Sequence, residues 1–194
     1  EQPLKWKKPK MIFVCSMGDF FHEDVKPQWI DDIYEIMAAC PQHTFQLLTK
    51  RPENIDKTLY GITEETPCRE LGGGDFLPNV WLGITAENQK RADERIPILL
   101  QTPAAVRFVS IEPMLKAISI FPYLCNIPEH QHWDAQKTKP ILGLDWVIVG
   151  GETGPGARPM HPGWVRDVRD QCQVAGVPFF MKKMSGGGQP PGEL

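Results

Sequence analysis

Acidic and basic side chains follow each of six short apolar runs in this chain. The charged residues at these positions are Asp19, Lys50, Arg51, Glu87, Glu112, Glu152 and Lys182. Carboxylates beside cationic groups suit the binding of a zwitterionic or phosphorylated small molecule and the transfer of protons. Carboxylates that cap the following helices and pair with lysines would leave a similar pattern. The density of acids at these ends favours the ligand site.

Hydroxyl groups and glycines complete the clusters. Ser16 precedes Asp19 after the first apolar run, and Thr49 ends the second run. The most distinctive segment is GGETGPGARP at 150–159, whose glycines permit positive φ and close approach of the backbone to a ligand. Arg158 within it is suited to clamp an anion. The segment matches neither a P-loop nor a dinucleotide-binding motif, so a tight loop with a structural arginine is the alternative.

Cysteines and histidines give no compact metal site. The five cysteines lie at least 25 residues apart, so no CxxC pair or three-cysteine loop is present. An odd, scattered set is typical of free thiols in a reducing compartment, which predicts a cytoplasmic protein. Cys15 and Cys172 fall in an apolar run and on a helical stripe, and we expect them in the core. His22 and His161 are expected to cap or to be exposed.

The six apolar runs predict the strands that position the clusters. They are Met11–Ser16, Thr44–Thr49, Val80–Thr85, Val106–Ser110, Trp146–Gly150 and Pro178–Met181. Such nearly continuous apolarity indicates parallel strands that crossover helices cover on both faces. Since the carboxyl ends of parallel strands meet at one edge, all six clusters are expected to share one rim.

Amphipathic segments between the runs predict helices. Apolar stripes extend from Trp29 to Cys40, from Ala92 to Leu100 and from Trp164 to Ala175, where Gly176 ends the third. Two weaker helical segments are predicted at Pro52–Tyr60 and Pro113–Leu124. Residues 61–78 and 126–143 are expected to form loops or insertions.

About six βα units in 194 residues predict one α/β domain over residues 1–194. An open doubly wound sheet and an incomplete TIM-type (β/α) barrel both fit, since a full barrel needs about 250 residues. A net charge of −3 argues against a general nucleic-acid-binding surface. No apolar run approaches the roughly 18 residues of a membrane helix. The short basic start with Lys5, Lys7, Lys8 and Lys10 is typical of a solvated surface, and a nucleic-acid partner is left open.

Five blocks that cover nearly the whole chain carry a resemblance to a known family. They read IFVCSMGDFFHEDV, HTFQLLTKRPEN, PNVWLGITAENQ, ADERIPILLQTPAAVRFVSIEPML and DWVIVGGETGPGARPMHPGWVRDVRDQCQVAGVPFFMKK, in that order. In these blocks the chain resembles a phage and prophage protein family of unknown function that is related to the radical SAM enzymes. The resemblance implies an incomplete TIM-type barrel.

The resemblance also implies that S-adenosylmethionine binds at the rim of the strands. Backbone at the glycine-rich end, carboxylates for the amino and ribose groups, and a cation for the carboxylate would hold it. The residues expected in this role are Lys50, Glu112, Gly150, Gly151, Glu152 and Arg158. Further rim candidates are Ser16, Asp19, Thr49, Arg51, Glu87 and Lys182.

Family members similar to this chain carry an upstream segment with three cysteines, and nothing of that kind precedes Glu1. We therefore expect a native chain that starts upstream, and a [4Fe–4S] cluster only if that part supplies the thiolates. As given, the chain is expected to lack radical chemistry. The missing segment would supply a first strand, so the edge at Met11–Ser16 is expected to be exposed and to support a homodimer or aggregation.

Two other functions stay open. A non-redox α/β binding or metal-dependent hydrolytic module would use the acids of the rim for a divalent metal or a phosphorylated ligand. A structural phage or adaptor protein without a ligand would fit the acidic charge and the lack of a catalytic-triad signature. A small-molecule ligand is the expected partner, and the substrate and reaction are left open.

Overall fold

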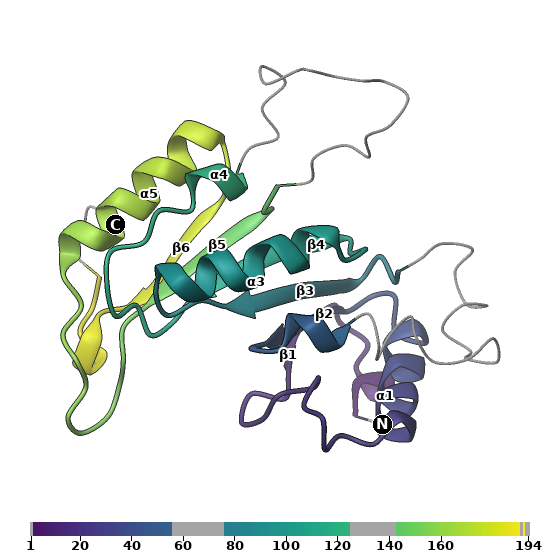
Figure 1. Ribbon diagram of the computed structural model, residues 1–194. Helices are drawn as coiled ribbons and strands as arrows, with labels where there is room; N and C mark the ends of the chain where they lie inside the picture. The colour runs from purple at the N-terminus through teal and green to yellow at the C-terminus, as the bar shows by residue number, and fades with distance from the viewer. Residues whose placement is uncertain (1, 56–75, 125–142, 191, 193–194) are drawn as a thin grey trace, which may run out of the picture. The chain divides into compact units, whose positions relative to one another are not determined.

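The computed structural model describes residues 2–55, 76–124, 143–190 and 192, and its elements are labelled in Figure 1. The strand pairs β1–β2, β2–β3, β4–β5 and β5–β6 are parallel. The strand order is β1-β2-β3-β4-β5-β6. This sequential order is the topology of an incomplete (β/α) barrel, because a doubly wound sheet reverses its order at a switch point. The predicted fold class is confirmed.

The chain divides into two compact units. Unit 1 comprises residues 1–84 and 102–107, and unit 2 comprises residues 85–101 and 108–194. The interpretation of residues 1–194 as one domain stays a prediction. Each unit is therefore described by itself.

Unit 1 holds the first strands and one long helix. Its elements are a 3₁₀ turn at Pro3–Lys5, β1 at Met11–Val14, α1 at Pro27–Ala38, β2 at Thr44–Thr49, a 3₁₀ turn at Pro52–Asn54, and β3 at Val80–Thr85, whose last residue belongs to unit 2. The helix begins at Pro27, whose fixed φ and missing N–H suit the first helical position. It buries Ile30, Tyr34 and Met37 on one side.

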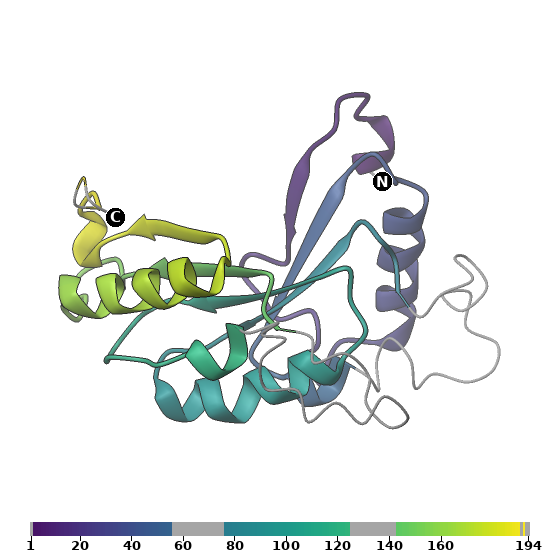
Figure 2. The same ribbon diagram turned by 90° about the horizontal axis from the view of Figure 1, so that it is seen from above.

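Unit 2 holds the last strands. Its elements are α3 at Gln89–Gln101, most of β4 at Val106–Ile111, α4 at Phe121–Leu124, β5 at Trp146–Gly150, α5 at Pro162–Ala175, β6 at Phe179–Lys183 and a 3₁₀ turn at Ser185–Gly187. Figure 2 shows α5 running alongside β6, with which it is in contact. Val165, Val168 and Cys172 are the buried residues of α5. As predicted, the helix ends at Gly176, which has a φ of 68° and a left-handed conformation.

Two predicted core residues are exposed. The first strand ends at Val14 rather than Ser16, because the Gly18 N–H donates to the Cys15 carbonyl in a tight turn. Cys15 has a φ of 56° and is exposed, so its predicted core position is wrong. Trp29 of α1 is 53 % exposed and lies under the Lys26 ammonium, 5.3 Å from the ring centroid. The other predicted strands agree with the observed ones within two residues.

The weaker helical segments are shorter than predicted. Of Pro113–Leu124, only Phe121–Leu124 is helical, with Pro122 in its first turn. Of Pro52–Tyr60, Pro52–Asn54 forms a 3₁₀ turn, and residues 56–60 lie outside the described chain. The loops predicted at 61–78 and 126–143 also lie outside it, except for 76–78 and 143, which form neither helix nor strand. No helix in the described part of the chain is long and apolar enough to span a membrane.

Strand β1 is the first strand of the order, and two of its apolar side chains, Met11 and Phe13, are 57 % and 45 % exposed. An exposed apolar edge strand tends to pair with another chain. We therefore expect the mass measured by light scattering to rise with protein concentration. Phe13→Lys is expected to suppress this rise, and Phe121→Lys, on α4 and 38 % exposed, serves as the control. A monomer mass at every concentration would contradict the expectation.

Candidate functional site

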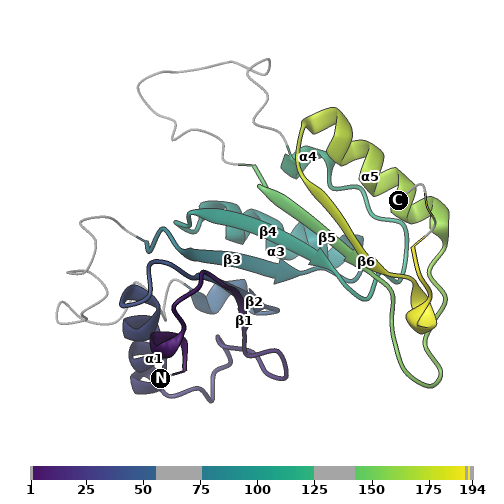
Figure 3. The same cartoon turned by 180° about the vertical axis from the view of Figure 1, so that it is seen from behind.

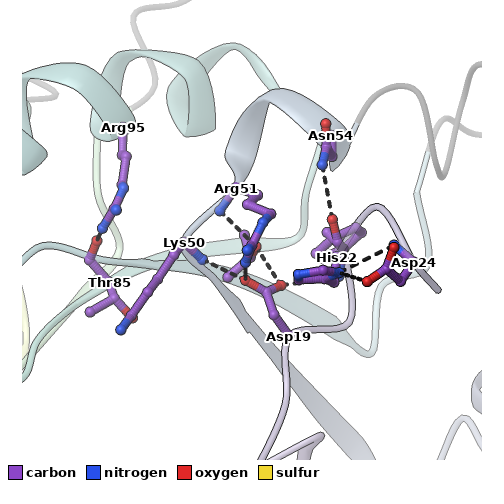
Figure 4. Close-up of polar contacts among 10 residues, drawn as sticks. Asp19, His22, Asp24, Lys50, Arg51, Asn54, Thr85 and Arg95 are labelled. Atoms are coloured by element: carbon purple, nitrogen blue, oxygen red, sulfur yellow. Dashed lines mark hydrogen bonds and ion pairs between the residues drawn. The ribbon is translucent and has the colours of Figure 1, made fainter.

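In unit 1, Asp19 is the centre of a hydrogen-bond cluster (Figure 4). Its carboxylate accepts from the Lys50 N–H at 3.0 Å, the Thr49 hydroxyl at 2.7 Å, the Phe21 N–H at 3.1 Å and the Arg51 guanidinium at 3.1 Å. Burial alone would raise the pKa of this carboxyl, but the four hydrogen bonds outweigh burial and hold the pKa below its usual range. The cluster ties the turn after β1 to the end of β2.

Two further candidates of unit 1 stand apart from this cluster. The exposed side chain of Lys50 extends away from the Asp19 carboxylate in Figure 4, and only its backbone N–H takes part. Ser16 is exposed in the turn after β1. Unit 1 therefore brings Asp19, Thr49 and Arg51 together in a cluster whose polar groups hydrogen-bond to one another.

In unit 2, an ion pair joins the ends of two strands that are not neighbours. The Lys182 ammonium of β6 lies 3.0 Å from Oε2 of Glu112, which follows β4. Strand β5 lies between β4 and β6, and the pair passes over its last residue, Gly150. A Cβ at Gly150 would lie 2.9 Å from Cδ and Oε1 of Glu112. The missing side chain at this position is what admits the pair.

The pairing of β6 is irregular at this point. Val149 pairs with Met181, but the next residue, Gly150, pairs with Lys183. Lys182 is thus the extra residue of a β-bulge, a feature that redirects side chains at the ends of strands. Its ammonium is directed toward Glu112, and its side chain is 50 % exposed.

Gly151, which directly follows β5, lies against the turn that follows β6. A Cβ at Gly151 would contact the backbone nitrogen of Ser185 and lie 2.7 Å from its Cα. The Gly186 N–H donates to the Glu152 carbonyl at 2.9 Å, so the turn lies against the end of β5 (Figure 3). The Ser185 hydroxyl oxygen is buried and has no hydrogen-bond partner among the described residues.

Sequence reasoning missed Ser185. The signal for it is the one that marks the other clusters, a hydroxyl and a run of glycines directly after an apolar strand. The buried and unpartnered state of the hydroxyl is visible only in three dimensions.

Glu152 and Arg158 form an ion pair within one loop. Arg158 donates to the Glu152 carboxylate from Nε at 2.8 Å, from Nη2 at 2.7 Å and from its backbone N–H at 2.8 Å. The side-chain hydrogen bonds, with help from the backbone bond, lower the pKa of Glu152 to about 2. They close a loop in which Gly154 and Gly156 have φ of 98° and 75°. Arg158 thus binds a carboxylate of its own loop, which agrees with the alternative of a tight loop with a structural arginine, and its role toward a ligand stays a prediction.

Glu87 pairs with Arg95, whose Nη1 lies 2.9 Å from its Oε2. The Leu115 N–H donates to the Glu87 carbonyl, and the Met114 N–H donates to the Gly150 carbonyl. These two bonds hold Met114 and Leu115, which follow β4, against the end of β5 and against the segment that follows β3. Glu87 therefore belongs to the same end of unit 2 as Gly150.

Each acid of the predicted rim thus faces a cation. Unit 2 brings together Glu87, Glu112, Gly150, Gly151, Glu152, Arg158 and Lys182, and unit 1 holds Ser16, Asp19, Thr49, Lys50 and Arg51. Within the described ranges, no group of three or more His, Cys, Asp or Glu is placed to hold a metal ion. A divalent metal at any of these carboxylates would lie beside a lysine or arginine, whose positive charge repels it.

The two histidines and one of the cysteines considered in the sequence have clear surroundings in the structure. His161 caps α5, because its Nδ1 accepts from the Gly163 N–H at 3.0 Å, and this confirms the predicted role. His22 is part-exposed and accepts from the Asp24 N–H. Cys172 is buried, as predicted, and burial raises the pKa of its thiol to about 12.

A family model described as "Protein of unknown function (DUF5131)" matches residues 1–190. The chain belongs to this family. No curated protein and no solved structure matches it. The DUF5131 description names no activity, so the links to phages and to radical SAM enzymes stay predictions.

Asp19→Asn is expected to lower the free energy of unfolding of this DUF5131 protein by about 1–3 kcal/mol at pH 7, because the amide loses charge-assisted bonds. The folded-state pKa of Asp19 lies below the unfolded value. Its stabilisation is therefore complete above about pH 4 and is lost as pH falls through the folded pKa. Urea unfolding between pH 3 and 7 should show the two proteins converge in acid. Asp24→Asn, 88 % exposed, is the control, and a difference independent of pH would contradict the assignment.

Ser185→Ala is expected to leave the free energy of unfolding of the DUF5131 protein unchanged or to raise it by about 1 kcal/mol, because a buried hydroxyl without a partner only costs desolvation. Thr49→Val is the matched contrast, since the Thr49 hydroxyl donates to Asp19 and accepts from the Arg51 N–H. That variant should lose about 1–2 kcal/mol in urea unfolding. An equal loss in both variants would mean that the Ser185 hydroxyl has a partner in the folded protein.

Proposed function

We propose that this chain binds S-adenosylmethionine by its amino acid end, at the carboxyl ends of β4, β5 and β6. The observation that carries the proposal is the Glu112–Lys182 pair, whose side chains are 23 % and 50 % exposed. A zwitterionic amino acid that enters this pair places its ammonium on Glu112 and its carboxylate on Lys182. One ion pair is then replaced by two charge-assisted ones.

The neighbouring residues suit such a ligand. Gly150 has no side chain, and this lets the Glu112 carboxyl lie directly over the end of β5. The Ser185 hydroxyl has an unused hydrogen-bonding capacity at the same end of β5. A carboxylate has about four acceptor sites, and Arg158 uses three of those on Glu152, so one remains for a ribose hydroxyl. These features support the assignment of Glu112 and Glu152 to the site, whereas Gly150 and Gly151 make room for Glu112 and for the turn after β6.

S-adenosylmethionine supplies methyl transfer or, together with an iron–sulfur cluster, one-electron chemistry. The sequence carries no compact three-cysteine motif, so the proposal for this chain is binding and orientation of the cofactor. The relation to radical SAM proteins and to phages is part of the proposal and rests on the five sequence blocks. A metal-dependent module is less well supported, because every described rim carboxylate already faces a cation.

The test is isothermal titration calorimetry with S-adenosylmethionine. The wild type is expected to bind, and Glu112→Gln and Lys182→Met should each weaken binding about tenfold or more, since bonds to charged groups contribute about 1.5–3 kcal/mol. Lys90→Met on α3, 78 % exposed, is the control and should bind as the wild type does. L-methionine should compete, whereas 5′-methylthioadenosine, which lacks the amino acid end, should compete poorly.

No binding by the wild type would refute the proposal, as would full binding by both Glu112→Gln and Lys182→Met. Iron and sulfide measured in the same anaerobic preparation test the cluster separately.

A further inference from the structure

A row of aromatic rings crosses β4, β5 and β6 in unit 2. The centroids of Phe108 and Trp146 are 5.8 Å apart, and those of Trp146 and Phe180 are 6.4 Å apart. Exposure increases along the row, because Phe108 is fully buried, Trp146 is intermediate and Phe180 is 50 % exposed. The last ring therefore offers an apolar surface to an incoming molecule.

This ring shares its face of β6 with the charged end of the proposed site. Alternation along β5 places the Trp146 ring and the Cβ direction of Gly150 on one face of the sheet. The Trp146 ring lies beside the Phe180 ring, and the Glu112 carboxyl lies at the Cβ position of Gly150.

Lys182, the bulge residue, reaches this face because its ammonium contacts Glu112, and Met181 points to the opposite face from Phe180. The exposures agree, since Met181 is 8 % exposed and Phe180 is 50 % exposed. Two residues along a strand correspond to about 7 Å. The exposed ring of Phe180 thus lies two residues along β6 from Lys182, whose ammonium pairs with Glu112.

The chemistry of this pair selects among the molecules that carry a flat ring. Glu112 and Lys182 have opposite charges and compensate each other. A phosphate that approaches Lys182 also meets the Glu112 carboxylate, so a nucleic-acid strand is disfavoured. A zwitterionic head group is favoured, because each of its charges finds a partner.

We infer that the ligands of this rim are α-amino acids that carry a planar aromatic group, and that Phe180 holds this group by stacking. The inference rests on the proposed function for the amino acid end, and it adds the class of side chain that is accepted. An amino acid with a flexible aliphatic side chain makes the same charged contacts but gains no stacking. Phe180 is therefore the residue that sets the preference for a ring.

The experiment compares three probes, S-adenosylmethionine, L-tryptophan and L-methionine, on the wild type and on Phe180→Leu by titration calorimetry. Phe180→Leu is expected to weaken binding of the two ring-bearing probes about tenfold, the lower part of the range for stacking on an aromatic side chain. Binding of L-methionine should change less than twofold. Phe121→Leu, which removes the 38 % exposed ring of α4, is the control and should bind all three probes as the wild type does.

Each outcome separates this inference from the proposed function. If S-adenosylmethionine binds and Phe180→Leu leaves its affinity unchanged, the role of Phe180 is overturned and the proposed function stands. If only L-tryptophan and L-methionine bind, the cofactor assignment fails and the effect of Phe180→Leu on L-tryptophan decides the inference. If no probe binds the wild type, the inference and the proposed function are both refuted.

A second variant guards against a folding defect. Phe180→Tyr keeps the ring and is expected to retain the affinity of the wild type for the ring-bearing probes. A loss in Phe180→Leu that extends equally to L-methionine, or that Phe180→Tyr shares, would also overturn the inference, since neither follows from stacking.

Discussion

The ion pair between Glu112 and Lys182 constrains three strands of unit 2 at once. It joins the ends of β4 and β6 over β5, so the residue beneath it must have no side chain, and that residue is Gly150. The adjacent Gly151 is restricted in the same way by the backbone of the turn after β6. Two consecutive glycines thus let the chain close over the strand ends, and the site depends on side chains that are missing as much as on those that are present.

The acids at the strand ends differ in how completely they are satisfied. Among the described residues, the carboxylate of Asp19 accepts four hydrogen bonds and that of Glu152 accepts three, whereas those of Glu87 and Glu112 accept one each. Arg95, the partner of Glu87, also donates to the Thr85 carbonyl and is 11 % exposed, whereas Lys182, the partner of Glu112, is 50 % exposed. A ligand must replace whatever bonds a carboxylate already makes. The cluster of Asp19 is therefore suited to stability, the pair of Glu152 to shaping its loop, and Glu112 to exchange with a ligand.

The strands could be predicted because each is a nearly continuous apolar run, and β2, β3 and β5 have the predicted bounds. The end of α5 at Gly176 also follows from local conformational preference. The partner of each acid could not be predicted in this way. Glu112 and Lys182 are 70 residues apart, and they meet because of strand order, register and a bulge that no local pattern encodes. The exposure of Trp29 and Cys15 likewise depends on which elements pack against them.

The ion pair best suited to function is then the one that has a single hydrogen bond and a half-exposed cation. Exposed pairs contribute only about 0–1 kcal/mol, because water solvates both charges when the pair opens. Opening the half-exposed contact of Lys182 is correspondingly cheap, whereas removing a partner from a buried network leaves a charge unsolvated. A zwitterion that enters beside Phe180 gains two charged contacts and an apolar surface in return for one weak pair. In the same unit, the strongly bonded Glu152 keeps the loop after β5 in place while that exchange occurs.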